Sequence, residues 1–112
     1  MHEMSIAESI LSIAEDYRVR EGAGRIAEVT LLLGEMAGVE TESLGFCWQA
    51  LTKGTAAEGA RLNYHHLPLV GRCTACGREE KIEGYRFRCS VCSEPLETVS
   101  GRELQVESLE LE

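Results

Sequence analysis

Two pairs of cysteines carry the clearest chemistry in this sequence. Cys73 and Cys76 form one C-x-x-C pair, Cys89 and Cys92 form the other, and twelve residues separate the pairs. Each C-x-x-C turn brings two sulfurs within reach of one ion, and a hairpin that delivers the second turn completes a tetrahedron of soft ligands, which suits Zn(II). Two disulfides or uncommitted thiols are the plain alternative, and a thioredoxin-like redox pair would need one C-x-x-C beside a βαβ pattern. We predict a Zn(II) site.

The segment around the four cysteines needs such a site in order to fold. Residues 70–99 offer little core beyond a few apolar side chains, and units below about 40 residues usually require a metal or disulfides; those side chains are Val70, Ile82, Tyr85, Phe87 and Val91. Residues 71–93 hold five cations and three anions, whereas both flanking segments are acidic. Four thiolates around one divalent cation would offset this local positive charge. Because four protein ligands leave no open position, the predicted site is structural.

The opening Met1-His2-Glu3 is a second, weaker metal signal. A terminal amine, an imidazole and a carboxylate lie within three residues, and deprotonated backbone amides of His2 and Glu3 could add nitrogen ligands for Ni(II) or Cu(II). A terminal histidine alone is more often no ligand. His65 and His66 would point to opposite faces of a strand, which favours a surface pair over a shared metal site.

Hydrophobic spacing predicts helices and strands in alternation. A capping box of Ser5 and Glu8 predicts a first helix from residue 5, with Ile6, Ile10, Ile13 and Tyr17 as its apolar stripe. The pattern predicts a half-buried strand over residues 27–34 and a second helix over residues 41–53, capped by Thr41 and with Cys47 on its apolar face. A second strand starts near residue 62. The apolar residues of 104–111 change parity, which indicates a bulge near Ser108 or burial on both faces.

Composition and charge exclude several classes of function. The chain has 112 residues, a net charge of -8 and 44% hydrophobic residues. Such an acidic chain is a poor generic nucleic-acid binder. No run of about 18 apolar residues could span a membrane, and no secretory signal is visible. We therefore expect the protein to be in the cytoplasm, a compartment in which disulfides rarely persist. We also expect no enzyme, because no grouping of nucleophile, base and orienting residue is visible in the sequence.

The sequence resembles the HypA/HybF family of hydrogenase-maturation nickel metallochaperones from end to end. The resemblance rests on the order and spacing of short segments, each unspecific alone: Met1-His2-Glu3, Leu33-Gly34, Val39, Leu44-Gly45-Phe46, Lys53-Gly54-Thr55, Ala57-Glu58-Gly59-Ala60, the two C-x-x-C pairs, and the closing stretch from Gly101 to Leu111. It implies an α+β fold with two helices on a small mixed three-stranded sheet. A zinc-ribbon-like domain with four cysteine ligands, residues 70–99, is inserted into a nickel-binding domain formed by residues 1–69 and 100–112.

The resemblance also implies a function and its ligands. Ni(II) would bind at His2 with Glu3 beside it, the Met1 amine being a further candidate ligand, and Zn(II) would be structural at Cys73, Cys76, Cys89 and Cys92. Nickel would be delivered to a [NiFe]-hydrogenase large subunit or its maturation complex, in some members also to urease, together with a HypB-like GTPase. Neither a membrane nor a nucleic acid is an expected partner, and a homodimer is compatible with the sequence.

Two features depart from the family pattern, and one rival function remains. Cys89 is followed by Ser90, where relatives commonly have proline, and the chain has no histidine after His66, so the zinc segment contributes no imidazole to nickel. The rival is a zinc-ribbon nucleic-acid module, since residues 71–93 are basic and contain Tyr85 and Phe87. Oligonucleotide binding that depends on salt would favour that module, whereas nickel binding that requires His2 would favour metal delivery.

Overall fold

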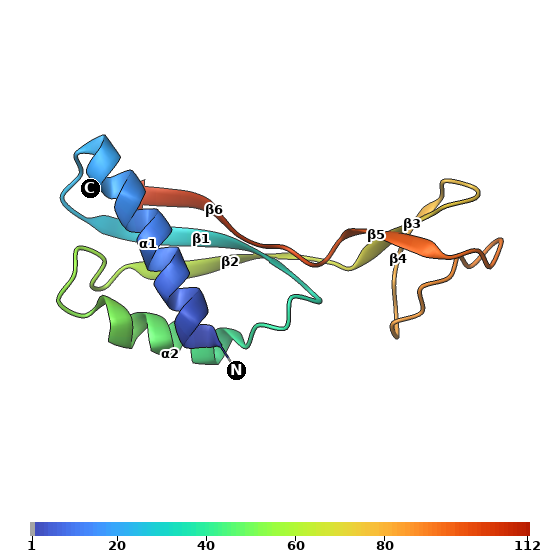
Figure 1. Ribbon diagram of the computed structural model, residues 1–112, viewed down its shortest axis with the longest axis horizontal. Coiled ribbons are helices and arrows are strands. Elements are labelled where there is room, and N and C mark those ends of the chain that lie inside the picture. Colours follow the sequence, from blue (N-terminus) through green and yellow to red (C-terminus); the bar gives the residue numbers. More distant parts are fainter. Residues whose placement is uncertain (1) are drawn as a thin grey trace. The chain divides into compact units, whose positions relative to one another are not determined.

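The chain folds into two compact units in the computed structural model, which describes residues 2–112 (Figure 1). Unit 1 contains the described residues up to 31 together with 38–65 and 105–112, and unit 2 contains residues 32–37 and 66–104. Unit 2 thus holds all four cysteines of the C-x-x-C pairs as well as the end of the first strand and the turn that follows it. Neither helix of the described chain is long and apolar enough to cross a membrane.

Two helices and a three-stranded sheet of strand order β2-β1-β6 form the α+β part of the fold. Its elements are α1 (Glu3–Glu21), β1 (Ile26–Gly34), α2 (Thr41–Thr52), β2 (Arg61–Leu67) and β6 (Leu104–Leu111). Backbone bonds from Ile26 to Ala56 and from Glu35 to Leu67 keep β2 parallel to β1, whereas bonds from Arg25 to Glu112 and from Gly34 to Glu103 make β6 antiparallel. The predicted α+β fold, with two helices and a mixed three-stranded sheet, is confirmed.

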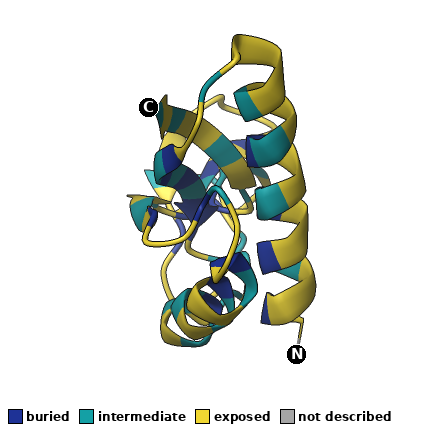
Figure 2. Cartoon of the chain, turned by 90° about the vertical axis from the view of Figure 1, so that its left-hand side faces the viewer, coloured by how far each residue is buried: buried dark blue, intermediate teal, exposed yellow. Residues whose placement is uncertain are grey.

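The first helix begins earlier than its sequence pattern predicts, and only part of its predicted apolar stripe, Ile10 and in part Ile6, packs into the core. His2, not Ser5, is the N-cap, and Glu3 is already helical. The buried residues are Glu3, Ala7, Ile10 and Ala14, while Ile13 and Tyr17 of the predicted stripe are largely exposed. Small alanines let the helix approach the sheet closely, and Ile10 is the one large apolar side chain among the buried residues of α1. Figure 2 shows the buried residues of α1 on the side that faces the sheet.

The second helix is capped by Glu40 rather than by Thr41. The Glu40 carboxyl group accepts a hydrogen bond from the Glu42 backbone N–H at 3.1 Å. Its buried side chains are Leu44, Trp48 and Thr52, and the Trp48 indole donates to the Ala60 carbonyl at 3.1 Å inside the core. This bond ties α2 to the segment that enters β2.

We expect Trp48→Phe to lower the free energy of unfolding by about 2 kcal/mol, because it leaves the buried Ala60 carbonyl without its donor and opens a small cavity. Chemical denaturation followed by far-UV circular dichroism measures the change. Val19→Ala, at a position that is 64% exposed on α1, serves as the control and should change stability by no more than about 0.5 kcal/mol. Equal stability of the two variants would contradict the assigned role of the indole.

The last strand is only half-buried against this core. Val106, Leu109 and Leu111 pack against the core cluster, whereas Leu104 is 38% exposed. The β1–β6 register is the same at the Gly34–Glu103 and Arg25–Glu112 ends, so no residue is inserted in one strand alone. The same change of parity occurs in β1, where Ile26 and Val29 are both buried.

Unit 2 contains a small antiparallel sheet of order β4-β3-β5, with β3 (Val70–Cys73) at its centre between β4 (Glu79–Lys81) and β5 (Leu96–Ser100). Its core consists of five buried residues: Leu69, Cys73, Ile82, Cys89 and Leu96. Two of these five are cysteines. Two of the four predicted metal ligands are therefore also core residues, as expected of a segment with so few apolar side chains.

Two side chains expected in this small core are on its surface instead. Tyr85 and Val91 are each 69% exposed, while Phe87 is partly buried against the core. Tyr85 follows Gly84 in a turn where both residues have positive φ, 60° for Gly84 and 56° for Tyr85. The tyrosine thus stands in a left-handed turn on the surface of unit 2.

Three backbone segments meet closely within unit 2, at the end of β1. A Cβ on Gly34 would lie 2.2 Å from the Gly101 carbonyl carbon, and a Cβ on Gly101 would lie 2.6 Å from the Leu69 Cα. The Met36 N–H donates to the Gly101 carbonyl at 2.7 Å, and the Leu69 N–H donates to the Glu35 carboxyl group at 3.1 Å. Only glycine at positions 34 and 101 permits this approach.

Candidate metal centres

Each C-x-x-C pair forms a tight turn of the same kind. The Cys73 N–H donates to Arg78 and its carbonyl accepts from Gly77; likewise, the Cys89 N–H donates to Glu94 and its carbonyl accepts from Ser93. Gly77 and Ser93, each directly after the second cysteine of its pair, have left-handed φ values of 77° and 63°. The sequence therefore builds two matching loops, each of which starts with a buried cysteine, Cys73 or Cys89.

The four sulfurs converge at the spacing of a tetrahedral metal site. All four lie within 4.8 Å of one another. The Cys73–Cys92, Cys76–Cys89 and Cys76–Cys92 sulfur pairs are 3.2, 3.9 and 4.0 Å apart. A tetrahedron with metal–sulfur bonds of about 2.3 Å has edges of roughly 3.8 Å. The cluster is therefore consistent with a zinc site, and the distances exceed the ~2.05 Å of a disulfide bond.

The protonation of this cluster also favours a cation. The Cys76 backbone N–H donates to the Cys73 sulfur at 3.4 Å and lowers the pKa of the Cys73 thiol to about 6, with further help from Cys92 and the Ala75 N–H against the effect of burial. At Cys92 the Glu94 N–H favours the thiolate, but Cys73, burial and Cys89 outweigh it and raise the pKa to about 12. One thiolate thus disfavours the next, and a divalent cation at the centre removes that repulsion.

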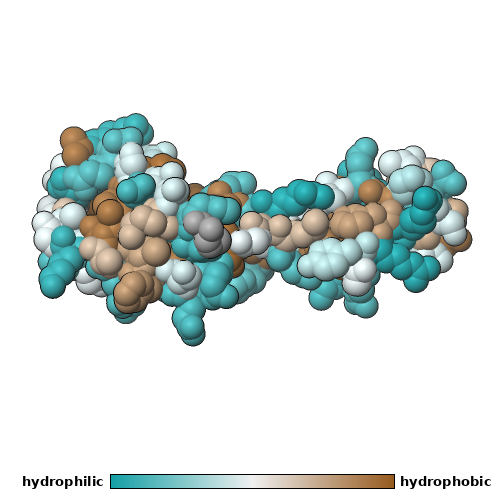
Figure 3. All heavy atoms as spheres, turned by 60° about the horizontal axis from the view of Figure 1, so that its bottom comes forward, coloured by the Kyte–Doolittle hydropathy of each residue, from teal (hydrophilic) through white to brown (hydrophobic). Residues whose placement is uncertain are grey.

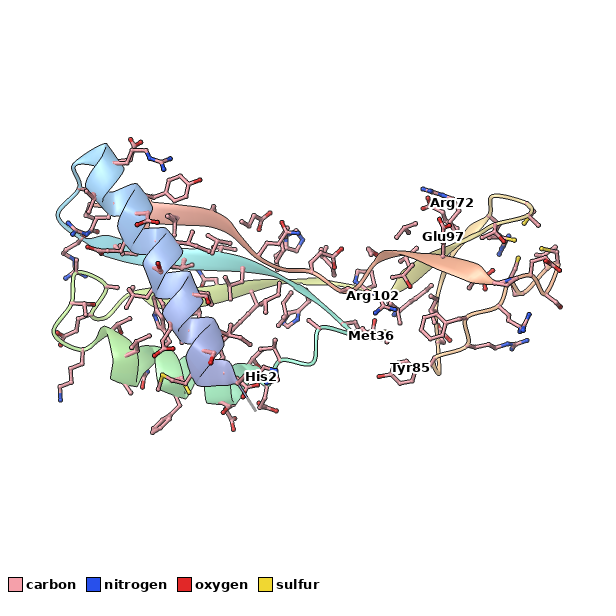
Figure 4. All side chains as sticks on the ribbon, viewed as in Figure 1. His2, Met36, Arg72, Tyr85, Glu97 and Arg102 are labelled. Carbon is pink, nitrogen blue, oxygen red and sulfur yellow. The ribbon has the colours of Figure 1, made fainter. Side chains whose placement is uncertain are left out.

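Several of the basic residues around the cysteines are already paired. Arg72 bonds Glu79 at 2.6 Å, and Arg78 bonds Glu80 at 3.2 Å. Ser90 donates through its hydroxyl to Glu80 at 2.9 Å, and these contacts lower the pKa of Glu80. Figure 4 labels Arg72 beside Glu97 in this unit. With two of the five cations engaged by carboxylates, unit 2 is a poorer polyanion surface than its composition indicates.

The opening residues predicted to bind nickel lie at the start of α1. His2 is the N-cap residue and is exposed, and its side chain makes no capping hydrogen bond (Figure 4). The first helical bond runs from the Ile6 N–H to the His2 carbonyl at 3.0 Å. The imidazole therefore does not cap the helix. The Met1 amine lies outside the described residues.

Glu3 occupies a different environment from the accessible one that its sequence position suggests. It is helical and only 3% exposed, and its Oε2 accepts a hydrogen bond from the Glu40 backbone N–H at 3.1 Å. The carboxyl group is thereby held at a fixed place at the start of α1, next to His2 in the chain. Sequence reasoning missed Glu40, because 37 residues separate the partners and no local pattern links them.

The electrostatics of a helix N-terminus decide how a cation could bind here. The partial positive charge of the first turn favours anions and disfavours a metal ion. The backbone N–H of Glu3 has no intrahelical partner, since the helix ladder begins at Ile6. A metal at this end would therefore need the Glu3 carboxylate and deprotonated amides to offset the dipole, which favours weak, exchangeable binding.

The other two histidines lie apart from the opening residues in the chain, on β2. His65 Nδ1 is 3.4 Å from Glu107 Oε1, and both side chains are exposed. His66 is exposed too. Within the described chain, the four cysteines alone form a group of three or more candidate side-chain ligands close enough to share an ion.

Comparison with known proteins identifies the family. The family model described as hydrogenase/urease nickel incorporation metallochaperone, HypA, matches residues 1–111. The chain belongs to the HypA family. HypA is described as a metallochaperone and a maturation factor, which hands on a metal, and not as a catalyst.

Relatives match this chain over its whole length. The hydrogenase maturation factor HypA of Chlorobaculum tepidum is 44% identical and that of Geobacter metallireducens 42%, each with 100% of both chains covered. A HypA solution structure matches with a TM-score of 0.78 at 20% identity, covering 100% of this chain and 97% of that one. The solution structure of the nickel metallochaperone HypA from Helicobacter pylori matches with a TM-score of 0.71 at 20% identity, covering 99% and 97%. The expected HypA fold is confirmed.

Proposed function

We propose that this chain binds Ni(II) at its N-terminus and delivers it to a [NiFe]-hydrogenase during maturation, with urease as a second candidate client. The full-length match to a hydrogenase/urease nickel-incorporation family carries the proposal. The arrangement at the start of α1 supports it, because His2 is exposed without a structural bond and Glu3 is fixed beside it by Glu40.

The proposed nickel ligands are His2 and Glu3, with the Met1 amine and the backbone amides as further nitrogen donors. Such a set suits Ni(II), which accepts imidazole and amide nitrogens in tetragonal geometry. Protons compete with the metal at the imidazole and at the amine, so binding should weaken as the pH falls. An accessible site with few permanent side-chain ligands also suits a metal that must leave again.

The proposed role of the four cysteines is to bind Zn(II) permanently. Cys73 and Cys89 are almost fully buried, and four thiolates on one Zn(II) would fill its tetrahedral shell and leave no position for a substrate. Residues 70–99 are then the structural zinc domain, and residues 1–69 with 100–112 the nickel-binding domain. A reduced thiol cluster of this kind suits the cytoplasm, where we place the protein.

The proposed partners follow from the family rather than from a surface of this chain. Nickel would pass to the hydrogenase large subunit or its maturation complex, assisted by a HypB-like GTPase. We propose neither nucleic-acid nor membrane binding, in keeping with the net charge of -8.

Nickel titration of zinc-loaded protein tests the site, with His2→Ala compared against wild type. We expect wild type to bind one Ni(II) per chain and His2→Ala to lose detectable binding, at least about tenfold in affinity, because the variant lacks the imidazole of the opening segment. Helix content and zinc stoichiometry should not change, since His2 makes no side-chain capping bond. Isothermal calorimetry and d–d absorption report the nickel.

Three matched variants sharpen this test. Glu3→Gln keeps an acceptor for the Glu40 N–H and removes the charge, so weaker nickel binding in a stably folded protein would identify the carboxylate as a ligand. One residue added ahead of Met1 should weaken binding if the amine is a ligand. The double variant His65→Ala/His66→Ala should bind nickel normally. Full-strength binding in His2→Ala, or its loss in the double variant alone, would refute the assignment.

A further inference from the structure

The four cysteines of unit 2 differ in their access to solvent. Cys73 and Cys89, the first cysteine of each pair, are each 2% exposed and belong to the core of the unit. Cys76, the second cysteine of its pair, is exposed, and Cys92, the second of the other pair, is half-buried. Figure 3 shows hydrophobic residues among the hydrophilic ones on the surface of unit 2. Each loop therefore presents its second cysteine to small molecules in the solvent.

A hollow opens beside the first of these loops. It has a volume of about 510 Å³ and is lined by residues 72–77 together with Glu97. A small neutral oxidant such as hydrogen peroxide can enter a space of this size without any displacement of the backbone. Thiolate character and access decide which cysteines are oxidised, since the thiolate is both the metal ligand and the nucleophile. Cys76 lines this hollow and is the most accessible of the four.

The close sulfur pairs join one loop to the other. Cys76 Sγ lies 4.0 Å from Cys92 Sγ and 3.9 Å from Cys89 Sγ, and Cys73 Sγ lies 3.2 Å from Cys92 Sγ. A disulfide bond is about 2.05 Å long, so a movement of about 2 Å would bring the two accessible cysteines to bonding distance. A thioredoxin-like protein, by contrast, oxidises within one C-x-x-C pair. The spacing in unit 2 favours a bridge between the loops.

We propose that Cys76 is a site of oxidation by hydroperoxides, which ends in a Cys76–Cys92 disulfide and the release of the zinc. The inference rests on the zinc-binding role proposed above. The Cys76 thiolate attacks the peroxide, the oxygen–oxygen bond breaks, and a sulfenic acid and hydroxide form. The Cys92 thiolate then attacks the sulfenic sulfur and expels a second hydroxide. Solvent protons convert both hydroxides to water, so the two sulfurs lose two electrons and the peroxide gains them.

Loss of two ligands removes the metal and with it the support of unit 2. The two thiolates that remain do not complete a tetrahedral zinc shell. They are Cys73 and Cys89, two of the five core residues of the unit. Because the free energy of binding structural zinc is also folding free energy, oxidation should unfold unit 2 and leave the helices of unit 1 intact. The zinc is thus retained while the thiols are reduced and is released when they are oxidised.

Peroxide titration of the zinc-loaded, full-length protein tests this site. Metal analysis before peroxide is added establishes one zinc per chain, so a failure of the zinc assignment is seen separately. We expect hydrogen peroxide to release the zinc, measured with a chelating dye, with the loss of two thiols per chain. Dithiothreitol with added zinc should restore both.

A peptide map identifies the bridge. Trypsin cleaves after basic residues between the two loops, which are Arg78, Lys81, Arg86 and Arg88. After the remaining thiols are alkylated, a disulfide between the loops therefore links two separate peptides. Fragmentation of the linked peptides in the mass spectrometer should assign the bridge to Cys76 and Cys92.

Histidine at the two accessible positions provides matched variants. Cys76→His and Cys92→His each keep four zinc ligands, as in sites with three cysteines and one histidine, and remove one reacting thiol. Each should bind one zinc and release it to peroxide at least about tenfold more slowly than wild type. Cys92→His should also accumulate a Cys76 sulfenic acid that dimedone labels. Cys47→Ser, which changes a cysteine outside the cluster, should behave as wild type.

Three results would overturn the proposal. The first is zinc retained in wild type at peroxide concentrations that already oxidise Cys47. The second is a peptide map with disulfides only within the C-x-x-C pairs, a result that decides against the bridge even where a histidine variant does not hold zinc. The third is a zinc-loaded Cys76→His variant that releases its metal at the wild-type rate.

Discussion

Cys76→Ser is expected to release the zinc and unfold residues 70–99 while the helices of unit 1 remain. The free energy of binding structural Zn(II) to four ligands is about 10–16 kcal/mol and is also folding free energy for a small unit. Two of the five core residues of unit 2, Cys73 and Cys89, are proposed ligands of this zinc, so the apolar contacts that remain should not replace the metal. The zinc content of protein purified without chelator should fall from one ion per chain in wild type to none in the variant, as measured by metal analysis.

Cys47→Ser is the control for this experiment. Cys47 is a free, partly buried cysteine that packs against the core of unit 1 and does not belong to the four-sulfur cluster. Its replacement should leave one zinc per chain. Amide resonances of residues 70–99 should collapse in Cys76→Ser, whereas those of α1 and α2 keep their dispersion. Full zinc content, or an ordered unit 2 after zinc is lost, would contradict a structural role for the metal.

Gly34→Ala should lower the free energy of unfolding by about 3 kcal/mol or more. The added methyl group would lie 2.2 to 2.5 Å from three backbone atoms of Gly101 and Arg102. Backbone cannot move aside as the end of a flexible side chain can, so the crossing segments must separate. The bonds from Gly34 to Glu103 and from Met36 to Gly101 would be lost with that approach. Denaturant unfolding measures the change.

Gly24→Ala provides the comparison. A Cβ at Gly24 would lie 3.8 Å from the Glu112 carbonyl oxygen, which is ordinary van der Waals contact. Its stability should equal that of wild type or rise slightly, because alanine restricts the unfolded chain. A loss below about 1 kcal/mol for Gly34→Ala would show that the three segments can part at little cost.

The two proposed metal centres differ in the way that their tasks require. The cysteine cluster lies in the core of unit 2, with each sulfur pair held by its own backbone turn. The N-terminal site would rely on one exposed imidazole and one anchored carboxyl group at the end of a helix whose dipole opposes a cation. The first arrangement would retain a metal, and the second would let it exchange.

The sequence alone determined the features that depend on contacts between residues close together in the chain. The C-x-x-C turns form within five residues, so their spacing predicted the cluster, and Gly34 ended the first strand as expected. The order of short motifs along the chain identified the family and, with it, the mixed sheet. Local backbone geometry fixes these features, and the local sequence therefore contains them.

Tertiary structure decided which residues are buried and which distant groups meet. The predicted apolar stripe of α1 was Ile6, Ile10, Ile13 and Tyr17, of which Ile10 is buried and Ile6 packs against the core. Ile13 and Tyr17 are exposed, and Ala7 and Ala14 are buried instead, because small side chains allow the helix to pack closely on the sheet. Ser5 matched a capping pattern, yet the helix starts at Glu3, where a bond from Glu40 holds the carboxyl group. Burial and long-range hydrogen bonds depend on how elements pack, and no local pattern encodes that packing.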